Sequence, residues 1–498
     1  MSAMDNAPSP SIKDKVITGA AWMMAIKWSS RLMGLVSTMV LARLLTPADF
    51  GVVAVAMGLI GIIDAFFDFG FDLALIKNKK ATREDYDVVW SLRLVNMLAF
   101  GLIVALISPL VAQYANAPEV TLVCLVLALS IALRGLGNVG TIDFQKEMDF
   151  VRVFKFSFFP RTISVITTIV LAVIFRSYWA IILGALIKTL YTIVFSYSMS
   201  PFRPRLRFRG ASHIWSFSRW ILLGNMSRQL FNAMDRFLLA GLIGKSQLGL
   251  YNVAGNLASI VTIELLTPVG SALMPGFAKL QFEPERLRSA FLQSMTVLFA
   301  LTIPASVGVW LVAPELVRVL LGHQWEGAMG FVALFGFFYM FFSLTETLSS
   351  FMAMVGLINR SSVISLIRTI AFLAGFYFVF HRQGLEGVIY LKILLGGIEF
   401  MLLFEISRRF VQLPALTLLQ TTWRPVAAAV AMALAVTHLP LQDISSPLLL
   451  LLIKAVAGAL TYIAASLLLW LAAHKPHGLE SLVRDQIHNK LAMRASIQ

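Results

Sequence analysis

The sequence LARLLTPADFGVVAVA at residues 41–56 matches LAGLIGKSQLGLYNVA at residues 239–254 without a gap. The two stretches share a Leu-Ala-x-Leu start, one glycine and a Val-Ala ending at a constant offset. Extended outward, the match pairs residues 16–76 with 214–273 and Trp22 with Trp220. Apolar matches are common in an apolar sequence, so the paired tryptophans and glycines are the stronger evidence. The pattern predicts one ancestral lobe that is used twice.

The composition is that of a membrane protein. Of 498 residues, 58% are hydrophobic and 13% are charged, and the mean hydropathy is +0.80. Soluble domains carry about 25% charged residues. Apolar segments of about 20 residues or more follow one another along the chain, which predicts an all-α polytopic membrane protein.

The apolar segments predict fourteen helices. They are expected near 16–44, 48–76, 88–114, 119–141, 154–175, 178–200, 213–243, 247–275, 287–312, 328–356, 361–380, 384–407, 424–440 and 447–473. The predicted organisation is an N-lobe at 1–200, a basic linker at 201–212, a C-lobe at 213–410, two extra helices at 411–473 and a tail at 474–498. Because an even number of helices precedes the linker, the two six-helix lobes form a parallel repeat. Prolines and alternating charges in the linker disfavour a helix there.

The basic residues indicate the topology. Most Lys and Arg residues outside the helices fall on one side if the amino terminus is inside, so both termini are expected in the cytoplasm. This dispersal accounts for the net charge of +15 better than nucleic-acid binding does. The first apolar stretch is too long for a cleaved signal core. The single cysteine, Cys124, excludes an intramolecular disulfide.

Charged residues inside the predicted spans are the candidate functional residues, because each costs about 2.5 kcal/mol or more at membrane depth. We interpret the deep cations as lining a cavity that accepts an anionic headgroup, since Arg and Lys suit phosphate. The substrate-binding candidates are Lys27, Arg31, Arg228, Arg93 and Lys392. The ion-coupling or charge-pairing candidates are Asp64, Asp68, Asp72, Asp235, Arg236, Glu264 and Glu399.

Two features of these charges predict contacts. The acids Asp64, Asp68 and Asp72 are spaced to share one face of the second helix. Lys27 and Asp64 lie at similar depth on antiparallel helices and could pair. The alternative interpretation of all these charges is structural pairing or snorkelling to the interface. We favour this alternative for Arg161, Arg368 and Lys454.

Enzymatic signatures are weak in this sequence. The histidines show no zinc spacing, and we expect no metal, no cofactor and no catalytic residue. A multispanning glycosyltransferase would need acids in its first external loop. That loop, residues 46–49, has only Asp49, which can equally cap the next helix.

Several motifs resemble those of a known family. The run 41–51, LARLLTPADFG, is similar to the first-hairpin signature of the polysaccharide-transporter family, the Wzx-like lipid-linked oligosaccharide flippases. This family belongs to the multidrug/oligosaccharidyl-lipid/polysaccharide exporter superfamily. The run 68–76 resembles the family's second-helix ending, and 235–241 with 248–251 resembles the matching hairpin of the second lobe. The resemblance covers roughly residues 12–410.

The resemblance implies a function. The expected substrate is an undecaprenyl-diphosphate oligosaccharide, moved to the outer leaflet of the bacterial inner membrane by alternating access. Partners would be this lipid and the bilayer, with a polysaccharide polymerase and a chain-length regulator as further candidates, and no nucleic acid. The alternatives are a drug or cation exporter of the same superfamily, which would favour an acidic cavity, and a polysaccharide polymerase or ligase, which would need a large external loop.

Overall fold

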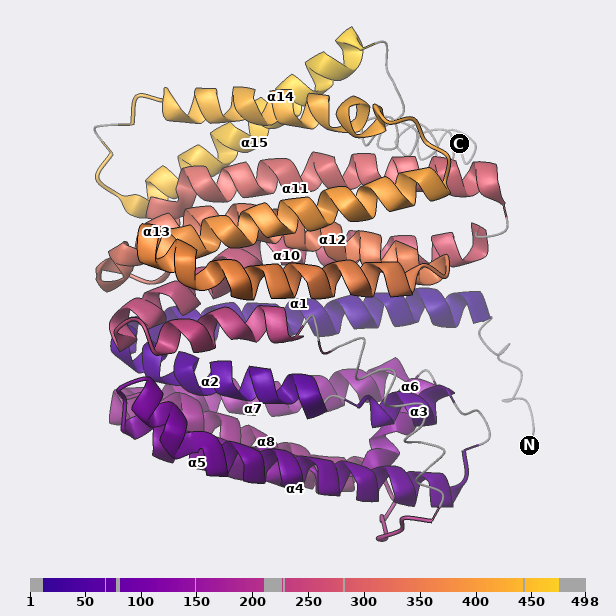
Figure 1. The fold of residues 1–498 in the computed structure, drawn as a ribbon, viewed down its shortest axis with the longest axis vertical. Helices are drawn as coiled ribbons and strands as arrows, with labels where there is room; N and C mark the ends of the chain where they lie inside the picture. Colours follow the sequence, from indigo (N-terminus) through magenta and orange to yellow (C-terminus); the bar gives the residue numbers. More distant parts are fainter. Residues whose placement is uncertain are drawn as a thin grey trace, which may run out of the picture. The chain divides into compact units, whose positions relative to one another are not determined.

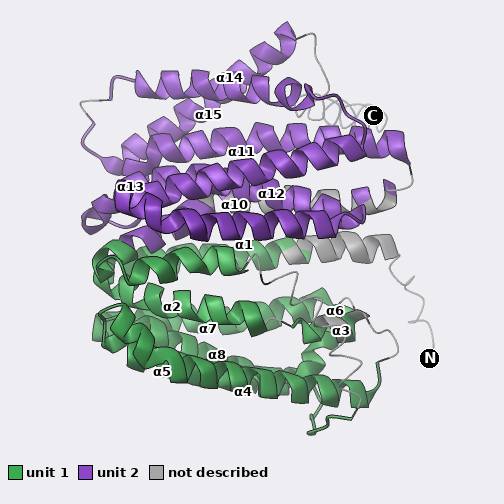
Figure 2. Ribbon diagram, in the orientation of Figure 1, with its two compact units in different colours: residues 1–249 green, residues 250–498 purple. Residues whose placement is uncertain are grey.

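The protein is described by a computed structural model that covers residues 12–67, 69–77, 81–147, 149–209, 226, 229–280, 283–441 and 444–473. Every regular element in this part of the chain is a helix, as the sequence predicts. The chain divides into two compact units, residues 1–249 and 250–498 (Figure 2). The division falls within a helix rather than at the basic linker. Consequently the described residues 229–249 of the predicted second repeat belong to unit 1.

Unit 1 is a bundle of long helices joined by short turns (Figure 1). Its elements are α1 (Ile12–Leu44), α2 (Pro47–Phe67), α3 (Phe71–Lys77), α4 (Arg83–Tyr114), α5 (Glu119–Arg134), η1 (Val139–Ile142), α6 (Asp143–Lys146), α7 (Phe150–Phe175) and α8 (Trp179–Met199). Residues 229–240 are also helical. The helices pack mainly as the pairs α4–α5, α7–α8 and α1–α7, and α5 also contacts α8.

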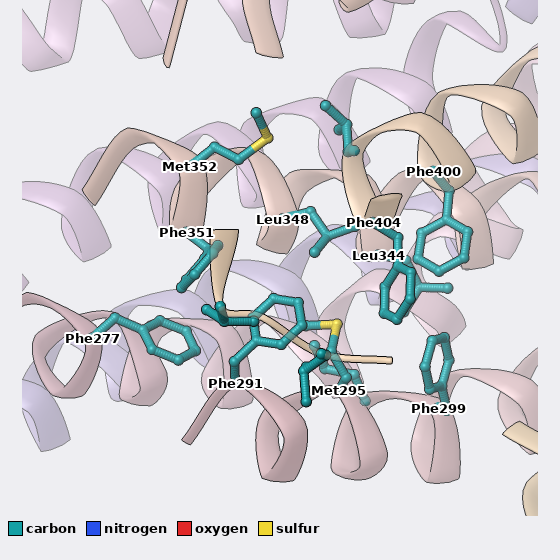
Figure 3. Packing of buried hydrophobic residues seen from close by; sticks show 14 of the residues in the cluster. Phe277, Phe291, Met295, Phe299, Leu344, Leu348, Phe351, Met352, Phe400 and Phe404 are labelled. Atoms are coloured by element: carbon teal, nitrogen blue, oxygen red, sulfur yellow. The ribbon is translucent and has the colours of Figure 1, made fainter. Parts of the chain in front are cut away.

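Unit 2 contains most of α10 (Lys245–Leu280) together with the helices that follow it. These are α11 (Pro284–Leu320), η2 (His323–Ala328), α12 (Met329–Met354), α13 (Ile358–Phe410), α14 (Thr417–Thr437) and α15 (Pro447–Ala472). The backbone of Gly384 is not helical, with φ 63° and ψ −148°, so α13 is two helices joined at this residue. The sequence predicts this break between 380 and 384. Phenylalanines of α10, α11, α12 and α13 form the core, including Phe277, Phe291, Phe351 and Phe404 (Figure 3).

The helices of both units have the length and composition of membrane spans. Among the described residues, eight are long and apolar enough to cross a membrane, or nine if α5 and the bent segment η1–α6 form one span. Large apolar side chains such as Leu106, Val194 and Leu468 are more than 60% exposed in the isolated chain. Lipid contact accounts for that exposure, because water would penalise it.

The predicted second helix, residues 48–76, is wrong as a single element. In the structure α2 ends at Phe67, Gly70 has a φ of 59°, and the chain resumes as α3. Glycine adopts this left-handed backbone at little cost, so it permits the break. The acids Asp64 and Asp72 therefore lie on two different helices and do not form the predicted stripe. Asp68 lies outside the described residues.

The single acid of the first hairpin caps a helix. The Thr46 hydroxyl donates to Asp49 Oδ2 over 2.7 Å, and the Thr46 N–H donates to the same oxygen over 2.9 Å. In return, the Asp49 N–H donates to Thr46 Oγ1 over 3.3 Å. This is a capping box with Pro47 at the first helical position, where its missing N–H costs nothing. The other oxygen of Asp49 accepts from the Tyr178 N–H over 3.1 Å.

We expect Asp49→Ala to lower the stability of unit 1 by about 0.5–2 kcal/mol, because α2 loses its cap and Tyr178 loses its acceptor. The measurement is the thermal midpoint of the purified protein. Asp49→Asn retains one acceptor oxygen and should lose less. An unchanged midpoint in Asp49→Ala would contradict the capping role. Asp49 would then again be a candidate for the acid that a glycosyltransferase needs in its first external loop.

The described part of the basic linker is not helical, as the prolines and charges predict, and it is bound to the helices of unit 1. Residues 201–208 contain no helix. The Arg205 N–H donates to Asp87 Oδ1 over 2.8 Å, and the Arg207 N–H donates to Ser91 Oγ over 2.8 Å. The Arg207 guanidinium lies 2.7 Å from Glu84 Oε2. These contacts hold the linker along α4.

The two glycines paired by the repeat meet in unit 1. A Cβ on Gly51 would lie 1.9 Å from the Lys245 carbonyl oxygen, and a Cβ on Gly249 would lie 1.9 Å from the Pro47 carbonyl oxygen. Both are backbone atoms, so the first turns of α2 and α10 are as close as two helices without side chains allow. Lys245 also forms an ion pair with Glu119 at the start of α5. Equivalent positions of the two repeats thus pack directly on each other.

Candidate functional site

Unit 1 encloses a pocket of about 630 Å³. This volume is in the usual range for ligand pockets. The pocket lies where α5 ends at Arg134 and the chain bends by 71° into η1 and α6. Its walls come from α2 to α8, with Ser130 of α5 bonded to Thr189 of α8 across 2.8 Å. Asn138 fixes the bend, because its N–H donates to Ser196 Oγ and its Oδ1 accepts from the Gly140 N–H.

The charged residues of the wall are mostly cations. Arg93 of α4, Arg134 of α5 and Lys188 of α8 face one acid, Asp72 of α3. Arg93 and Asp72 form a long ion pair of 3.8 Å. Within the described residues, no carboxylate oxygen lies within 4 Å of a side-chain nitrogen of Arg134 or Lys188. Asp64 of α2 also acts on Arg134 from outside the wall. Three positive charges against these two acids leave the pocket net cationic.

These cations belong to a larger series that we call the cation row: Arg31, Arg161, Lys188, Arg134 and Arg93. Each member is close enough to the next for electrostatic repulsion. Arg31 of α1 acts on Arg161 of α7, and Arg161 acts on Lys188. Arg134 acts on Lys188 and is itself affected by Arg93. The row therefore runs through unit 1 from α1 to α4.

The structure places the predicted residues of α1 at the protein surface. Lys27 and Arg31 are both exposed in the isolated chain. Lys27 makes no ion pair with Asp64 in the described structure, so the predicted pairing is wrong. Asp64 instead accepts a long hydrogen bond of 3.4 Å from Gln229 and acts electrostatically on Arg134. Arg228 lies outside the described residues.

The acid at the end of the predicted seventh helix is buried. Asp235 is 2% exposed, and its Oδ1 accepts from the Arg236 N–H over 2.9 Å. Arg236 is partly exposed and packs beside Gly58 of α2. For Glu264 the structure describes the backbone within α10 but not the side chain.

Unit 2 has a separate group of buried charges. Glu399 forms an ion pair with Arg368 and accepts a hydrogen bond of 2.7 Å from Ser365 Oγ. Lys392 is 3% exposed, and its ammonium lies 4.6 Å from the centre of the Phe338 ring. The sequence predicts Lys392 as a cavity residue, whereas the structure buries it between α12 and α13. Structural pairing, our preferred interpretation for Arg161, Arg368 and Lys454, agrees with the geometry of Arg368 and of Lys454, whose Nζ lies 2.6 Å from Glu315. Arg161 instead lies near the cation Arg31.

Sequence reasoning missed Arg134 as a candidate and gave no role to Lys188. Lys188 is the single charge of α8, and Arg134 shares α5 only with Glu119 at the other end of the helix, so neither has a charged partner at a helical spacing that marks it. The available signal was that both interrupt apolar segments. Arg134 and Lys188 line the same pocket because the chain bends after α5, and a hydropathy pattern does not predict that bend.

A family model described as "Polysaccharide biosynthesis protein" matches residues 40–330, more than half of the chain. The chain belongs to the polysaccharide biosynthesis protein family. The predicted membership is confirmed, and the matched region includes the first hairpin, the pocket and most of the cation row.

Two characterised relatives agree with the family. "Lipopolysaccharide biosynthesis protein WzxC" of Escherichia coli (strain K12) is 26% identical over 324 residues, which cover 64% of this chain and 65% of that protein. "Succinoglycan biosynthesis transport protein ExoT" of Rhizobium meliloti (strain 1021) is 26% identical over 336 residues, 66% of this chain and 67% of that protein. The chain thus aligns with about two thirds of the length of each relative.

Solved structures establish the fold class. A structure of the lipid II flippase MurJ in an inward closed conformation superposes with a TM-score of 0.73, covering 90% of this chain and 98% of that chain at 14% identity. An inward-facing multidrug resistance MATE transporter of the MOP superfamily superposes with a TM-score of 0.62. The superposition covers 77% of this chain and 94% of that chain at 17% identity. The fold is therefore that of the MOP transporters, which confirms the predicted all-α polytopic class.

Proposed function

We propose that this chain is a flippase for undecaprenyl-diphosphate-linked oligosaccharide units, which it moves across the bacterial inner membrane by alternating access. The single observation that carries the proposal is the cation row inside a unit of the polysaccharide biosynthesis family. A basic row embedded among membrane spans is costly unless an anion compensates it. The diphosphate of a lipid carrier is such an anion, and the named relatives act in lipopolysaccharide and succinoglycan synthesis.

The topology follows from the same proposal. Asn138 and Gln145 line the pocket, and the Asn138 side-chain amide donates to the Phe202 carbonyl of the basic linker over 2.7 Å, so this end of the pocket wall adjoins the linker. By the positive-inside rule the basic linker faces the cytoplasm, and the rule assigns both chain termini to the cytoplasm as well. Lipid-linked units would enter there and leave on the opposite side. A polymerase and a chain-length regulator would then act on the released units.

The two alternatives fit less well. A drug or cation exporter shares the fold, but a net-cationic pocket repels cationic substrates. A polymerase or ligase would need a catalytic extramembrane segment and, apart from residues 200–228, the connections between successive described helices are short. We therefore propose a transporter rather than an enzyme.

The deciding experiment is to deplete the protein in its native host and identify the lipid-linked intermediates by mass spectrometry. We expect an undecaprenyl-diphosphate oligosaccharide to accumulate in the inner leaflet, which would also identify the sugar unit. If the lipid-linked intermediates and the surface polysaccharide are both unchanged, the flippase proposal is overturned and the drug-exporter alternative is favoured.

Residues of α1 give a more specific test. We expect Lys27→Ala or Arg31→Ala to abolish polysaccharide export while leaving membrane insertion intact, because removing a charge from a span favours insertion. The measurements are surface polysaccharide and the amount of protein in the inner-membrane fraction. Arg203→Ala, which removes an exposed linker cation, is the control. Normal export by both α1 variants at native expression would contradict a headgroup role.

A further inference from the structure

The pocket of unit 1 has the features of a binding site that lacks its counter-charge. Its wall carries the cations Arg93, Arg134 and Lys188 against the single acid Asp72. Arg93 acts electrostatically on Arg134, and Arg134 acts on Lys188, so the three cations repel one another within the bundle. A bundle that only needed stability would place apolar residues at these positions. The arrangement therefore favours a bound anion.

The polar groups around the cations suit phosphate oxygens. Ser157 of α7 and Gln145 of α6 line the pocket, and their side chains form no hydrogen bond within the described residues. Arg134 offers a planar fork of donors from α5, and Lys188 offers a compact charge from the neighbouring helix α8. By contrast, Ser130, Thr189 and Thr192 already bond within the bundle. Free donors and cations thus face one another across the same space.

We propose that this pocket binds a phosphate or diphosphate group, with Arg134 and Lys188 as its principal ligands and Arg93 as a third. The inference rests on the proposed function in one respect, because the group would be the diphosphate of the transported lipid. The chemistry is shared with free pyrophosphate, and the experiment separates the two sources. The cation row would connect this site to Arg31 on the exposed face of α1.

The experiment uses the full-length protein in lipid nanodiscs at fixed ionic strength. Thermal midpoints and dissociation constants are measured with inorganic pyrophosphate, with farnesyl diphosphate and with farnesol. For the wild type, we expect the two diphosphates to bind and to raise the midpoint, and farnesol to do neither. Tighter binding of farnesyl diphosphate than of pyrophosphate would identify a lipid headgroup site. Equal affinities for farnesyl diphosphate and pyrophosphate would identify a site that recognises only the phosphate groups.

The variants locate the binding. Arg134→Gln and Lys188→Met should each weaken diphosphate binding at least tenfold, since each removes a charged donor worth about 1.5 kcal/mol or more. Lys188→Arg should retain it. Arg382→Gln, an exposed cation beside Phe378 in unit 2, is the matched control and should bind as the wild type does.

A merely structural role predicts a different result. If the cations only stabilise the bundle, Lys188→Met lowers the midpoint of the ligand-free protein. If they form an anion site, the ligand-free midpoint stays the same or rises, because repulsion from Arg134 and Arg161 is removed. Diphosphate binding that is absent from the wild type, or unchanged in Arg134→Gln, would overturn the proposal. This experiment measures binding and not transport. A failure of the anion-site proposal here would therefore leave the flippase proposal, which the depletion experiment tests, unaffected.

Discussion

Gly249→Ala should destabilise unit 1 and reduce polysaccharide export, whereas Gly244→Ala should do neither. The added methyl of Gly249→Ala would lie 1.9 Å from the Pro47 carbonyl oxygen and 3.0 Å from the Gly51 nitrogen. Backbone atoms cannot rotate away, so the first turns of α2 and α10 must separate. Overpacking of this kind costs about 1–3 kcal/mol. At roughly 2–4 °C per kcal/mol for a unit of this size, the midpoint should fall by about 2–12 °C.

Export should fall because neighbouring contacts depend on the same spacing. Near these glycines, Lys245 pairs with Glu119, and the Tyr114 hydroxyl donates to the Leu238 carbonyl over 3.0 Å. The Tyr114 ring covers Gly241 and stacks on Phe237. Moving α10 away from α2 would disturb all of these contacts.

The control lies in the same hairpin. Nothing lies within 4 Å of the position that a Cβ on Gly244 would occupy. Midpoints are measured on purified protein, and export is normalised to the amount of folded protein. Equal midpoints for Gly249→Ala and the wild type would show that the two helices can separate without cost, and would contradict the close-packing role of the glycine pair.

The sequence predicted the helices well because their signal is local. Apolar length alone locates the spans, and a capping box such as Thr46 to Asp49 is confined to four consecutive residues. Even the break at Gly384 has a local cause, because a glycine there takes a left-handed backbone. The missed break after Phe67 had the same signal in Gly70, but the apolar residues on both sides obscured it.

The candidate site was harder to predict because its parts meet only in three dimensions. The helical spacing of Asp64 and Asp72 suggested one face, but the break separates them and brings Asp72 to Arg93. Likewise, Lys392 and Glu399 are two turns apart on one helix. The partner of Glu399 is nevertheless Arg368, which the turn at Gly384 folds back against it. Spacing describes one helix and cannot identify the residue that faces it.

That buried pair supports the second large effect, a loss of folded protein in Glu399→Gln. The side chains of Arg368 and Glu399 are only 9% and 2% exposed. The amide would remove the ion-pair partner of the Arg368 guanidinium and leave Glu346 as an acid that still acts on it. Breaking a buried pair on one side costs up to about 3–5 kcal/mol. The folded fraction after detergent extraction and the thermal midpoint both measure this loss.

A double variant distinguishes pairing from ion coupling. Glu399→Leu combined with Arg368→Met removes both charges, and replacement of a buried pair by apolar residues is often neutral. We therefore expect the double variant to recover most of the stability that Glu399→Gln loses. Glu326→Gln is the surface control, because its partner Arg318 is exposed and water screens the pair. If Glu399→Gln were as stable as the wild type but failed to transport, the charge would act in coupling rather than in holding α13 together. Because Glu399 is buried against Arg368 and also accepts a hydrogen bond from Ser365, we expect the structural result.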